Sequence, residues 1–480
     1  MSKPIIGWES ETPIPAHHTF NHFLRAADGE LWMDQLNLTK LIVQKGYANL
    51  GRTLTSPTEI VYLPMIRKKV RDLQDAFARA IETLGYPGKF HYVYASKANA
   101  AEEVVRTILG TGANYEFSSW MDIEIARQMC REGHLTGNQF ILCNGFKPAG
   151  SRYSAELIKF QQDHGRVIPI IDSPDELAPL IEAGIPMEVG LRLKCYGDQH
   201  NAEEMDALNI RFGMEVEVIH QMAERIAAAP HLSLVMVHAM VGGQLTEMDE
   251  FLARLATPMQ VYADLARKYP SLRYFNYGGG LPVGLTLDFA FDYEVFAGRL
   301  LGAFRQVCAA AQVPPPDVLG EMGRYTVAEH GAHIFRIKAV KNNRSTYPWY
   351  IIDGSIMSSF PDVWALAEHF IVLPLNHLDK PFQQVQLGGI TCDSDDVYPP
   401  KKSHSPLYLP VETEDLYIAF FGVGAYQEML GGVGGSKHCV IPEADEVVVD
   451  LDPRGEPVFE VLPGQGSAQV LKNLGYKIAN

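Results

Sequence analysis

The sequence predicts an α/β protein built from a (β/α)8 barrel and a second, mostly β domain. Between about residue 64 and residue 330, short β-like runs alternate with longer segments that have helical apolar spacing. Eight such repeats fit within roughly 250 residues, which is the usual size of a (β/α)8 barrel. After residue 330 the pattern changes to short strand-like runs separated by turns, as in a β domain. A doubly wound sheet is the alternative for the first region, but it does not need eight units so evenly spaced.

Each barrel strand is predicted from a short apolar run with many β-branched or aromatic residues. The eight runs are Phe90–Ser96, Ala113–Ser118, Gln139–Cys143, Val167–Ile171, Met187–Leu193, Leu232–Met240, Tyr274–Tyr277 and Val318–Met322. The other segments have apolar residues at i, i+3 and i+4, and one such helix precedes the first strand. The predicted helices are Met65–Leu84, Ala101–Leu109, Ile123–Cys130, Ala155–Gln162, Glu176–Ile181, Val216–Ala228, Phe251–Lys268 and Tyr293–Ala311.

The predicted domains are an N-terminal segment of residues 1–63, a barrel of residues 64–330 and a C-terminal β domain of residues 331–480. A chain of 480 residues is long enough for two or three domains. The N-terminal segment has little periodicity, apart from a plausible strand at Glu59–Tyr62 that we expect to join the β domain. The strands predicted in that domain are Ala332–Val340, Trp349–Ile352, Phe370–Leu373, Gln384–Leu387, Leu416–Phe420, Glu446–Val449 and Val458–Val461.

Composition and charge exclude several classes of protein. The net charge of -16 opposes binding to nucleic acid or to an anionic membrane. No stretch approaches the roughly 20 apolar residues of a membrane span, and the N-terminus lacks the pattern of a secretion signal. The six cysteines have no paired spacing, which favours reduced thiols and opposes a disulfide framework or a zinc site. We therefore expect a cytoplasmic protein without a bound metal, nucleic-acid partner or membrane partner.

The first predicted barrel strand ends on a lysine. The run Tyr92-Val-Tyr-Ala-Ser-Lys97-Ala-Asn99 places an ammonium group at the strand's carboxyl end, where barrels bind their ligands. A desolvated lysine there can lose its proton near neutral pH and form a Schiff base with a carbonyl. Most lysines at strand ends are solvated surface charges, so Lys97 becomes a candidate catalytic residue only through its neighbours.

Two further motifs lie at the carboxyl ends of the predicted seventh and eighth strands: the glycines follow strand seven, and Glu321 lies in strand eight, three residues before Arg324. Gly278, Gly279 and Gly280 let backbone N–H groups approach a phosphate closely, although three glycines can also be a flexible turn. Glu321 can hold a protonated ring nitrogen and Arg324 offers a planar fork to phosphate oxygens, although the two could form an ordinary surface pair. A lysine, a phosphate cradle and a carboxylate at one barrel rim are the groups that hold pyridoxal phosphate.

These motifs resemble the fold-type-III pyridoxal-phosphate decarboxylases, which have alanine-racemase-like barrels and act on ornithine, arginine or diaminopimelate. The resemblance extends from about residue 58 to residue 440. It implies that Lys97 carries pyridoxal 5'-phosphate and that the glycine loop, Glu321 and Arg324 bind it. It also implies that Tyr426, in Gly424-Ala-Tyr426, lies near the cofactor phosphate.

The resemblance implies a homodimer with shared active sites. The segment Cys392-Asp393-Ser-Asp-Asp396 is similar to the one that a family subunit inserts into its neighbour's site. Cys392 would then donate the proton that replaces the substrate's carboxylate. Asp393 and Asp396 would pair with the distal cation of a basic amino acid.

The resemblance also suggests the substrate. Segments such as Cys143-Asn-Gly-Phe-Lys147, Arg211-Phe-Gly213 and Gly424–Leu430 are similar to biosynthetic arginine decarboxylases. A guanidinium fits two carboxylate oxygens well, so arginine leads ornithine, lysine and diaminopimelate. By contrast, Ser-Lys97-Ala-Asn is nearer to the diaminopimelate enzymes, and the chain is shorter than the arginine enzymes.

Two positions depart from the family pattern. Met240 stands where the family has a histidine that covers the cofactor ring, and a thioether can cover an aromatic face but cannot carry charge. His238 lies two residues upstream and is either a partial substitute or a buried structural histidine. Glu116 stands where the family generally has aspartate. Two alternatives to a decarboxylase therefore stay open: an amino-acid racemase, which needs a second base, and a catalytically silent homologue.

Overall fold

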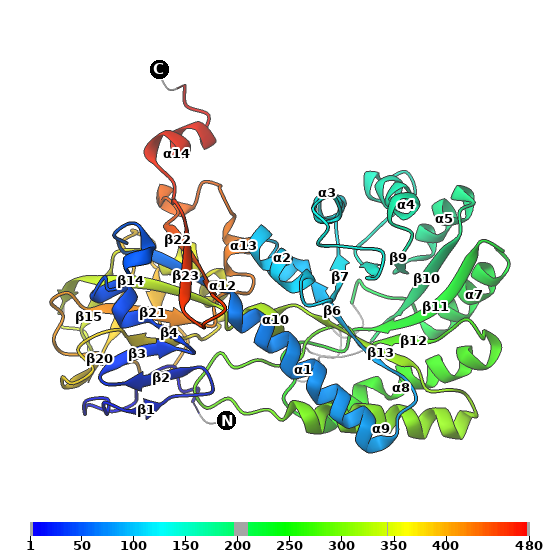
Figure 1. The fold of residues 1–480 in the computed structure, drawn as a ribbon, viewed down its shortest axis with the longest axis horizontal. Coiled ribbons are helices and arrows are strands. Elements are labelled where there is room, and N and C mark those ends of the chain that lie inside the picture. The colour runs from blue at the N-terminus through cyan, green and yellow to red at the C-terminus, as the bar shows by residue number, and fades with distance from the viewer. Residues whose placement is uncertain (1–2, 196–209, 343, 478–480) are drawn as a thin grey trace. The chain divides into compact units, whose positions relative to one another are not determined.

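The computed structural model describes residues 3–195, 210–342 and 344–477. These residues form two compact units (Figure 1). The barrel unit comprises Arg67–Pro282 and Phe291–Thr326, and the β unit comprises residues up to Ile66, Val283–Ala290 and the residues from Val327 onward. Val283–Ala290 falls within the predicted barrel range, but it belongs to the β unit, where the Leu287 amide donates to the Ile5 carbonyl at 2.8 Å.

The barrel unit is a closed ring of eight parallel strands in the order β10-β11-β12-β13-β6-β7-β8-β9. This arrangement confirms the predicted (β/α)8 barrel and all eight predicted strands. The strands are β6 (Phe90–Ala95), β7 (Asn114–Phe117), β8 (Ile141–Cys143), β9 (Val167–Ile171), β10 (Met187–Leu193), β11 (Leu232–Ala239), β12 (Tyr274–Asn276) and β13 (Asp317–Met322).

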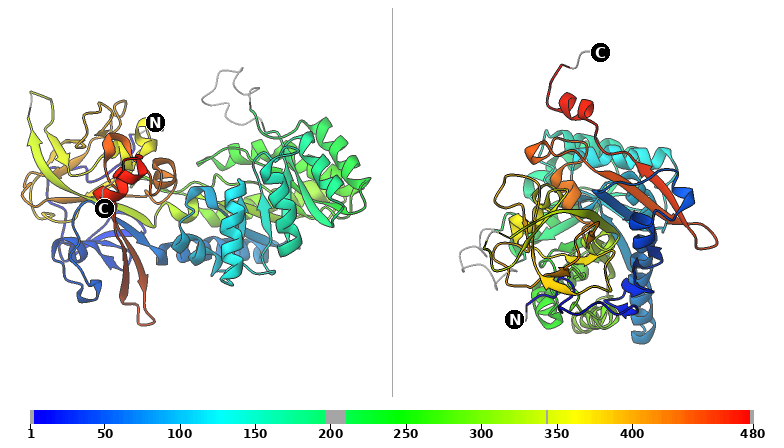
Figure 2. Two further views of the ribbon diagram at one scale, coloured as in Figure 1. Left: turned by 90° about the horizontal axis from the view of Figure 1, so that it is seen from above. Right: turned by 90° about the vertical axis from the view of Figure 1, so that its left-hand side faces the viewer.

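Helices lie outside the ring of strands (Figure 2). They are α2 (Glu102–Leu109), α3 (Trp120–Arg131), α4 (Arg152–His164), α5 (Leu177–Ala183), α7 (Val216–Ala227), α8 (Met248–Lys268) and α9 (Tyr293–Ala311). The long helix α1 (Leu63–Leu84) precedes β6, and the short helix α10 (Arg324–Val327) follows β13. The helix α3 begins at a capping box, in which Ser119 and Asp122 each accept from the other's backbone amide.

The barrel interior is closed by apolar side chains, which leaves the polar groups at the strand ends. The strand β9, Val-Ile-Pro-Ile-Ile, is buried along its whole length, as expected where a parallel strand is covered on both faces. The buried side chains that pack together inside are Val93, Phe140, Leu142, Ile168, Ile170, Val235, Met236, Tyr274 and Leu319. Ligand chemistry is therefore confined to the mouth of the barrel.

The β unit is built on a large mixed sheet. Its strands run in the order β19-β18-β15-β14-β5-β22-β23, and β21 joins both β14 and β16. The bounds are β5 (Thr58–Tyr62), β14 (Gly331–Lys341), β15 (Trp349–Ile352), β16 (Ile371–Pro374), β18 (Gln386–Gly388), β19 (Val397–Tyr398), β21 (Tyr417–Phe421), β22 (Asp445–Leu451) and β23 (Pro457–Leu462). The strand β5 pairs with β14 and β22, so Glu59–Tyr62 lies within this sheet.

Smaller elements complete the β unit. A four-stranded sheet of short strands, β1 (His18–Thr19), β2 (Leu24–Ala27), β3 (Glu30–Met33) and β4 (Leu36–Asn37), was not predicted because strands of two to four residues show little periodicity. The single strand predicted at Gln384–Leu387 is wrong. Its residues divide between β17 (Phe382–Gln384), which pairs with β20 (Tyr408–Pro410), and β18, because Val385 bonds instead to Leu407.

Several short helices connect these strands. They are α11 (Ile356–Ser359), α12 (Pro361–Leu366), α13 (Gln427–Gly431) and the terminal α14 (Ser467–Asn473). The hairpin of β22 and β23 extends beyond the rest of its unit in both views of Figure 2. Among the described residues, no helix is both long and apolar enough to cross a membrane.

Candidate active site

Lys97 lies at the mouth of the barrel, directly after β6. It is the middle residue of a single 3-10 turn, Ser96–Ala98, and its side chain is exposed while both of its neighbours are buried. The Ser96 hydroxyl donates to the Glu116 carbonyl at 3.0 Å and so fixes this turn to β7. The Lys97 ammonium interacts electrostatically with the carboxylates of Glu116 and Glu321. A lysine predicted from the strand pattern therefore faces a group of buried acids.

Two buried carboxyl groups share one amide at this end of the barrel. Asn144 Nδ2 donates to Glu116 Oε1 at 2.9 Å and to Glu321 Oε1 at 3.0 Å. Asn276 Nδ2 donates to the same Glu321 oxygen at 2.7 Å. The Ser118 hydroxyl donates to Glu116 Oε1 at 2.8 Å. Residues in or directly after β7, β8, β12 and β13 thus form one connected polar network.

Charge is distributed unequally over this network. Burial, together with the nearby Glu321, raises the pKa of Glu116 to about 7. Burial also opposes ionisation of Glu321, but His238, the amides of Asn144 and Asn276, and Lys97 hold its pKa below the usual value. Two close carboxyl groups in a low-dielectric site separate in this way. At neutral pH Glu321 is the ionised member and Glu116 is the member that readily holds a proton.

His238 completes the network without a hydrogen bond of its own. It is 2% exposed, and neither ring nitrogen has a hydrogen-bond partner within the described residues. Its Nε2 lies 3.5 Å from Glu321 Oε1. Burial lowers the pKa of His238 to about 4, so the ring is neutral at physiological pH. Unpaired polar atoms this deeply buried are rare and are typical of sites that receive a ligand.

The glycines after β12 form a turn that no other residue would fit. Gly278 and Gly280 have φ of +74° and +84°. A Cβ at Gly279 would lie 2.5 Å from the Glu321 carbonyl oxygen, and one at Gly280 would lie 2.0 Å from the Gly242 carbonyl oxygen. The Gln244 amide donates to the Gly280 carbonyl at 2.9 Å. Because the chain is packed this closely against the loop after β11, only glycine keeps the backbone available to a ligand.

The Met240 side chain packs against this turn. The Gly279 amide donates to Met240 Sδ at 3.3 Å, and a Cβ at Gly278 would lie 2.6 Å from the same sulfur. The thioether therefore lies against the predicted phosphate loop. This contact places the Met240 side chain at the mouth of the barrel. Its role in covering the cofactor ring stays a prediction.

Arg324 and Tyr426 lie in different units. Arg324 is partly buried at the start of α10, immediately after β13. Tyr426 belongs to the β unit, where it has a positive φ of 68°. Gln427 fixes this turn, since its Nε2 donates to Asp362 Oδ2 at 2.8 Å. A strained backbone at a non-glycine residue is often found in binding sites.

The loop that carries Cys392 and Asp393 also belongs to the β unit. Cys392 is exposed, and the Asp393 side chain is 27% exposed. Asp393 Oδ1 accepts from the Asp395 amide at 2.8 Å, while Oδ2 lies 3.4 Å from Nε2 of His438. The carboxylate that was predicted to meet a substrate cation therefore already has an imidazole next to it.

Asp396 has a different setting from Asp393. It is 2% exposed, and its oxygens accept from the Ser355 hydroxyl (3.1 Å), the Met357 amide (3.0 Å) and both the amide and hydroxyl of Thr391 (3.1 and 2.6 Å). These bonds saturate the carboxylate. Asp396 therefore stabilises the loop. Both of its side-chain oxygens are already engaged within this chain, so neither is available for the predicted contact with a substrate.

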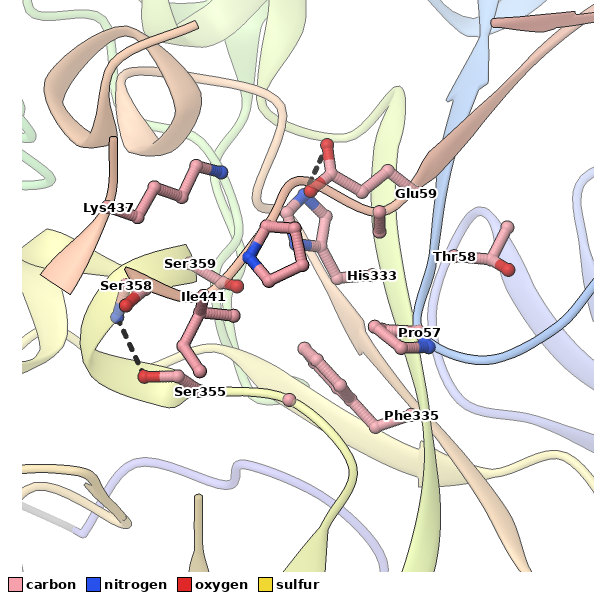
Figure 3. A pocket seen from close by; sticks show the side chains of 13 residues that line it. Pro57, Thr58, Glu59, His333, Phe335, Ser355, Ser358, Ser359, Lys437 and Ile441 are labelled. Carbon is pink, nitrogen blue, oxygen red and sulfur yellow. Dashed lines mark hydrogen bonds and ion pairs between the residues drawn. The ribbon is translucent and has the colours of Figure 1, made fainter. Parts of the chain in front are cut away.

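A small polar pocket in the β unit was not anticipated from the sequence (Figure 3). Glu59, from β5, and His333, from β14, lie 3.6 Å apart on one side, and Lys437 points toward the pocket from the other. Burial raises the pKa of Glu59 to about 7 and lowers the pKa of His333 to about 3. Neither residue stands out in the sequence, since each is a single polar position within an apolar strand.

Asn144 and Asn276 were also missed by sequence reasoning. Asn276 ends the otherwise apolar strand β12, and Asn144 directly follows the apolar strand β8. Such a residue at the carboxyl end of a strand is the signal that could have identified them.

Residues 65–328 match the family described as pyridoxal-dependent decarboxylase, pyridoxal binding domain. The match covers more than half of the chain. The chain belongs to this family. It is an enzyme of the pyridoxal-dependent decarboxylase class, and pyridoxal phosphate is its cofactor.

Whole-chain comparisons agree with this assignment. The biosynthetic arginine decarboxylase of Deinococcus radiodurans is 23% identical over 542 aligned positions, which cover 88% of this chain and 80% of that protein. Arginine decarboxylase 2 of Arabidopsis thaliana is 23% identical, covering 93% of this chain and 76% of that one. Because 542 aligned positions exceed the 480 residues of this decarboxylase, its relatives contain inserted residues that it lacks.

Solved structures share the fold. The biosynthetic arginine decarboxylase from Campylobacter jejuni superposes with a TM-score of 0.79 at 20% identity, covering 95% of this chain and 91% of that one. The diaminopimelate decarboxylase from M. jannaschii in complex with L-lysine gives 0.78 at 18% identity, covering 95% and 98%. Both likenesses support the barrel and the β domain of this decarboxylase.

The residues at the barrel mouth fit the cofactor. The ionised Glu321 suits a protonated pyridine nitrogen, and the glycine turn has the close packing that a phosphate loop needs. The unpaired atoms of His238, together with Glu116 Oε2, offer polar contacts to a ligand placed there.

Proposed function

We propose that this decarboxylase removes the α-carboxylate from a basic amino acid, with arginine as the first choice. The observation that supports a basic substrate is the Cys392 loop, in which a partly exposed Asp393 carboxylate stands beside an exposed thiol. A guanidinium can engage both oxygens of one carboxylate. The relatives that are arginine decarboxylases support arginine over ornithine, lysine and diaminopimelate.

We further propose which residues hold the cofactor. Lys97 carries pyridoxal phosphate, the Gly278–Gly280 turn, Arg324 and Tyr426 bind its phosphate, and Met240 covers its ring. When bound, the cofactor supplies an electron sink for the pair that carbon dioxide leaves on the α-carbon. Glu321 keeps a proton on the ring nitrogen, which makes that sink effective.

The chain's own residues then control two protons. Asn144 and Asn276 hold Glu321 in its ionised form and in a fixed orientation, so the proton on the ring nitrogen is retained. The Cys392 thiol gives its proton to the α-carbon of the product. Its exposed position in the loop lets it reach a substrate that a buried thiol could not.

Asp393 fixes the far end of the substrate in this proposal. Its Oδ2 lies beside His438, so the substrate cation would share this oxygen with the imidazole or displace it. Asp396 acts indirectly, because its hydrogen bonds shape the loop that presents Cys392 and Asp393.

We also propose a homodimer in which Cys392 and Asp393 of one subunit serve the barrel of the other, in the cytoplasm. The two candidate groups belong to separate units of the chain, which suits a shared site. If so, mixing Lys97→Ala and Cys392→Ala proteins restores part of the activity, because one site of the mixed dimer keeps both groups. A mixture that stays inactive although subunits demonstrably exchange would rule out the shared site.

The substrate is tested by a product screen. Purified enzyme with pyridoxal phosphate is given arginine, ornithine, lysine, diaminopimelate and neutral amino acids, and both amine and carbon dioxide are measured. We expect agmatine, the amine from arginine, to form fastest. Inverted amino acid without carbon dioxide would indicate a racemase. No reaction with any amino acid would indicate a catalytically silent homologue, for which Met240 is the motivating departure.

A further inference from the structure

Two cysteines that are far apart in the sequence meet in the β unit. Cys392 and Cys439 are both exposed and both reduced. The Cys439 thiol interacts electrostatically with Cys392, and the residues flanking the two cysteines are in contact, with Asp393 Oδ2 3.4 Å from His438 Nε2. No other pair among the six cysteines, all of which lie in the described residues, is joined in this way in the structure.

One short helix, α11, and its capping residue are hydrogen-bonded to both segments that carry these cysteines. Ser355, which caps α11, donates to Asp396 Oδ1 at 3.1 Å and so anchors the Cys392 loop. Ser358, in α11 itself, donates to the His438 carbonyl at 3.4 Å and anchors the segment of Cys439. Figure 3 shows Ser355 and Ser358 side by side, with Lys437 at the edge of the same pocket.

A direct link joins the two segments as well. Asp393 Oδ2 and His438 Nε2, the neighbours of the two cysteines, lie 3.4 Å apart. Three independent contacts therefore hold the two segments that carry the thiols next to each other. Two exposed thiols that are preorganised in this way are suited to forming a disulfide.

We propose that Cys392 and Cys439 form a reversible disulfide within one chain, which removes the Cys392 thiol from catalysis under oxidising conditions. The bridge itself follows from the contact; its effect on activity rests on the proposed role of Cys392 as proton donor. The device would make decarboxylation respond to the thiol–disulfide balance around the enzyme.

The oxidant is a small-molecule disulfide. One cysteine, as thiolate, attacks a sulfur of that disulfide, breaks its S–S bond and releases one small thiol, which leaves a mixed disulfide. The second thiolate attacks the protein sulfur and releases the other small thiol. The two cysteines lose two hydrogens and two electrons in total, and the small disulfide is reduced to two thiols. A dithiol reductant reverses both steps.

Partial desolvation, together with Cys392 and Asp393, raises the pKa of the Cys439 thiol. The reactive thiolate is therefore scarce at neutral pH, so the bridge needs an added oxidant and forms slowly in air.

The test treats the purified holoenzyme with oxidised glutathione and maps its peptides without reduction. We expect a cross-linked peptide pair containing Cys392 and Cys439, with the protein still migrating as a single chain on a non-reducing denaturing gel. A bridge between two chains, or glutathione retained on Cys392 of the wild type, would overturn the proposal.

Two variants sharpen the mapping. Cys439→Ser removes the second thiol, so the reaction should stop with glutathione attached to Cys392. Cys130→Ser, a matched change at a half-buried cysteine outside the pair, should form the bridge as the wild type does. If Cys439→Ser behaves like Cys130→Ser, the bridge does not involve Cys439 and the proposal is wrong.

Activity separates this inference from the proposed function. Oxidised wild type should lose most of its activity and recover it with dithiothreitol. If the mapped bridge forms while activity persists, the switch fails together with the assignment of Cys392 as proton donor. If the reduced enzyme decarboxylates no amino acid, the proposed function fails, while the peptide map still decides whether the bridge exists.

Discussion

Glu116 and Glu321 are bridged by the side-chain amide of a single asparagine, Asn144, at 2.9 and 3.0 Å. Both carboxyl groups are buried at the mouth of the barrel, where a second negative charge is costly. The shared donor keeps the two groups close while their pKa values separate, upward for Glu116 and downward for Glu321. The ionised state of Glu321 therefore depends on its neighbours as well as on its own hydrogen bonds.

Asn144→Ala should destabilise the protein and weaken its hold on the cofactor. The change removes one hydrogen-bond donor from each of two buried carboxyl groups, which costs about 1–3 kcal/mol in the free energy of unfolding. Chemical denaturation and a pyridoxal phosphate titration measure the two effects. Asn138→Ala, at an exposed position, is the control. Equal behaviour of the two variants would show that the shared amide contributes nothing.

Lys97 should be the residue that becomes covalently attached to pyridoxal phosphate. Its ammonium interacts with the two buried carboxyl groups of the barrel mouth, Glu116 and Glu321. Borohydride treatment of the holoenzyme, followed by peptide mapping, should place the reduced cofactor on Lys97. Attachment to another lysine would contradict the assignment. Lys89→Ala, directly before the same strand, is the control and should leave the attachment unchanged.

Gly280→Ala should lose cofactor affinity. The new Cβ would meet the Gly242 carbonyl oxygen at 2.0 Å, and the positive φ is unfavourable for alanine, so we expect a cost of at least about 1 kcal/mol in stability. Gly243→Ala is the matched control, because nothing lies within 4 Å of a Cβ built there. Thermal unfolding with and without pyridoxal phosphate measures both. If the two alanines behave alike, the tight turn is not what holds the cofactor.

Asp393→Asn should impair the use of arginine. A lost charge-assisted hydrogen bond is worth about 1.5–3 kcal/mol, or roughly ten- to hundred-fold in kcat/KM. Cofactor absorbance should be unchanged. Asp395→Asn removes the same charge from the same loop, but Asp395 pairs with Lys401 at 2.7 Å, so its kinetics should stay near wild type. Unaltered arginine kinetics in Asp393→Asn would argue against a basic substrate.

Glu59→Gln should stabilise the protein at alkaline pH but not at acid pH. Burial raises the folded-state pKa of Glu59 to about 7, above its ordinary 4.5. Below about pH 4.5 the group is protonated in both states, and glutamine changes little. As the pH rises toward 7, ionisation favours the unfolded wild type, so the gain from glutamine grows to at most about 3 kcal/mol.

Unfolding free energies between pH 4 and pH 8 measure this gain. Glu9→Gln, at an exposed position, is the control and should show no such trend. A gain for Glu59→Gln that is the same at all pH values would mean that the carboxyl group is not penalised by burial.

The amino-acid sequence by itself determined the barrel and the positions of its ligand-binding groups. Strand patterns are local, and in a parallel barrel every strand delivers its last residues to the same mouth. Lys97, the three glycines and Glu321 could therefore be assigned to one rim from their positions alone. The strand β5 could be assigned to the second domain in the same way.

Only the tertiary structure decided which polar groups touch. The Asn144 bridge depends on the register of four strands, and the saturation of Asp396 depends on hydrogen bonds from Ser355, Met357 and Thr391. The contact between Cys392 and Cys439 depends on two loops that α11 holds together. Residue spacing carries no information about such contacts, because they arise where segments distant in the chain pack against each other.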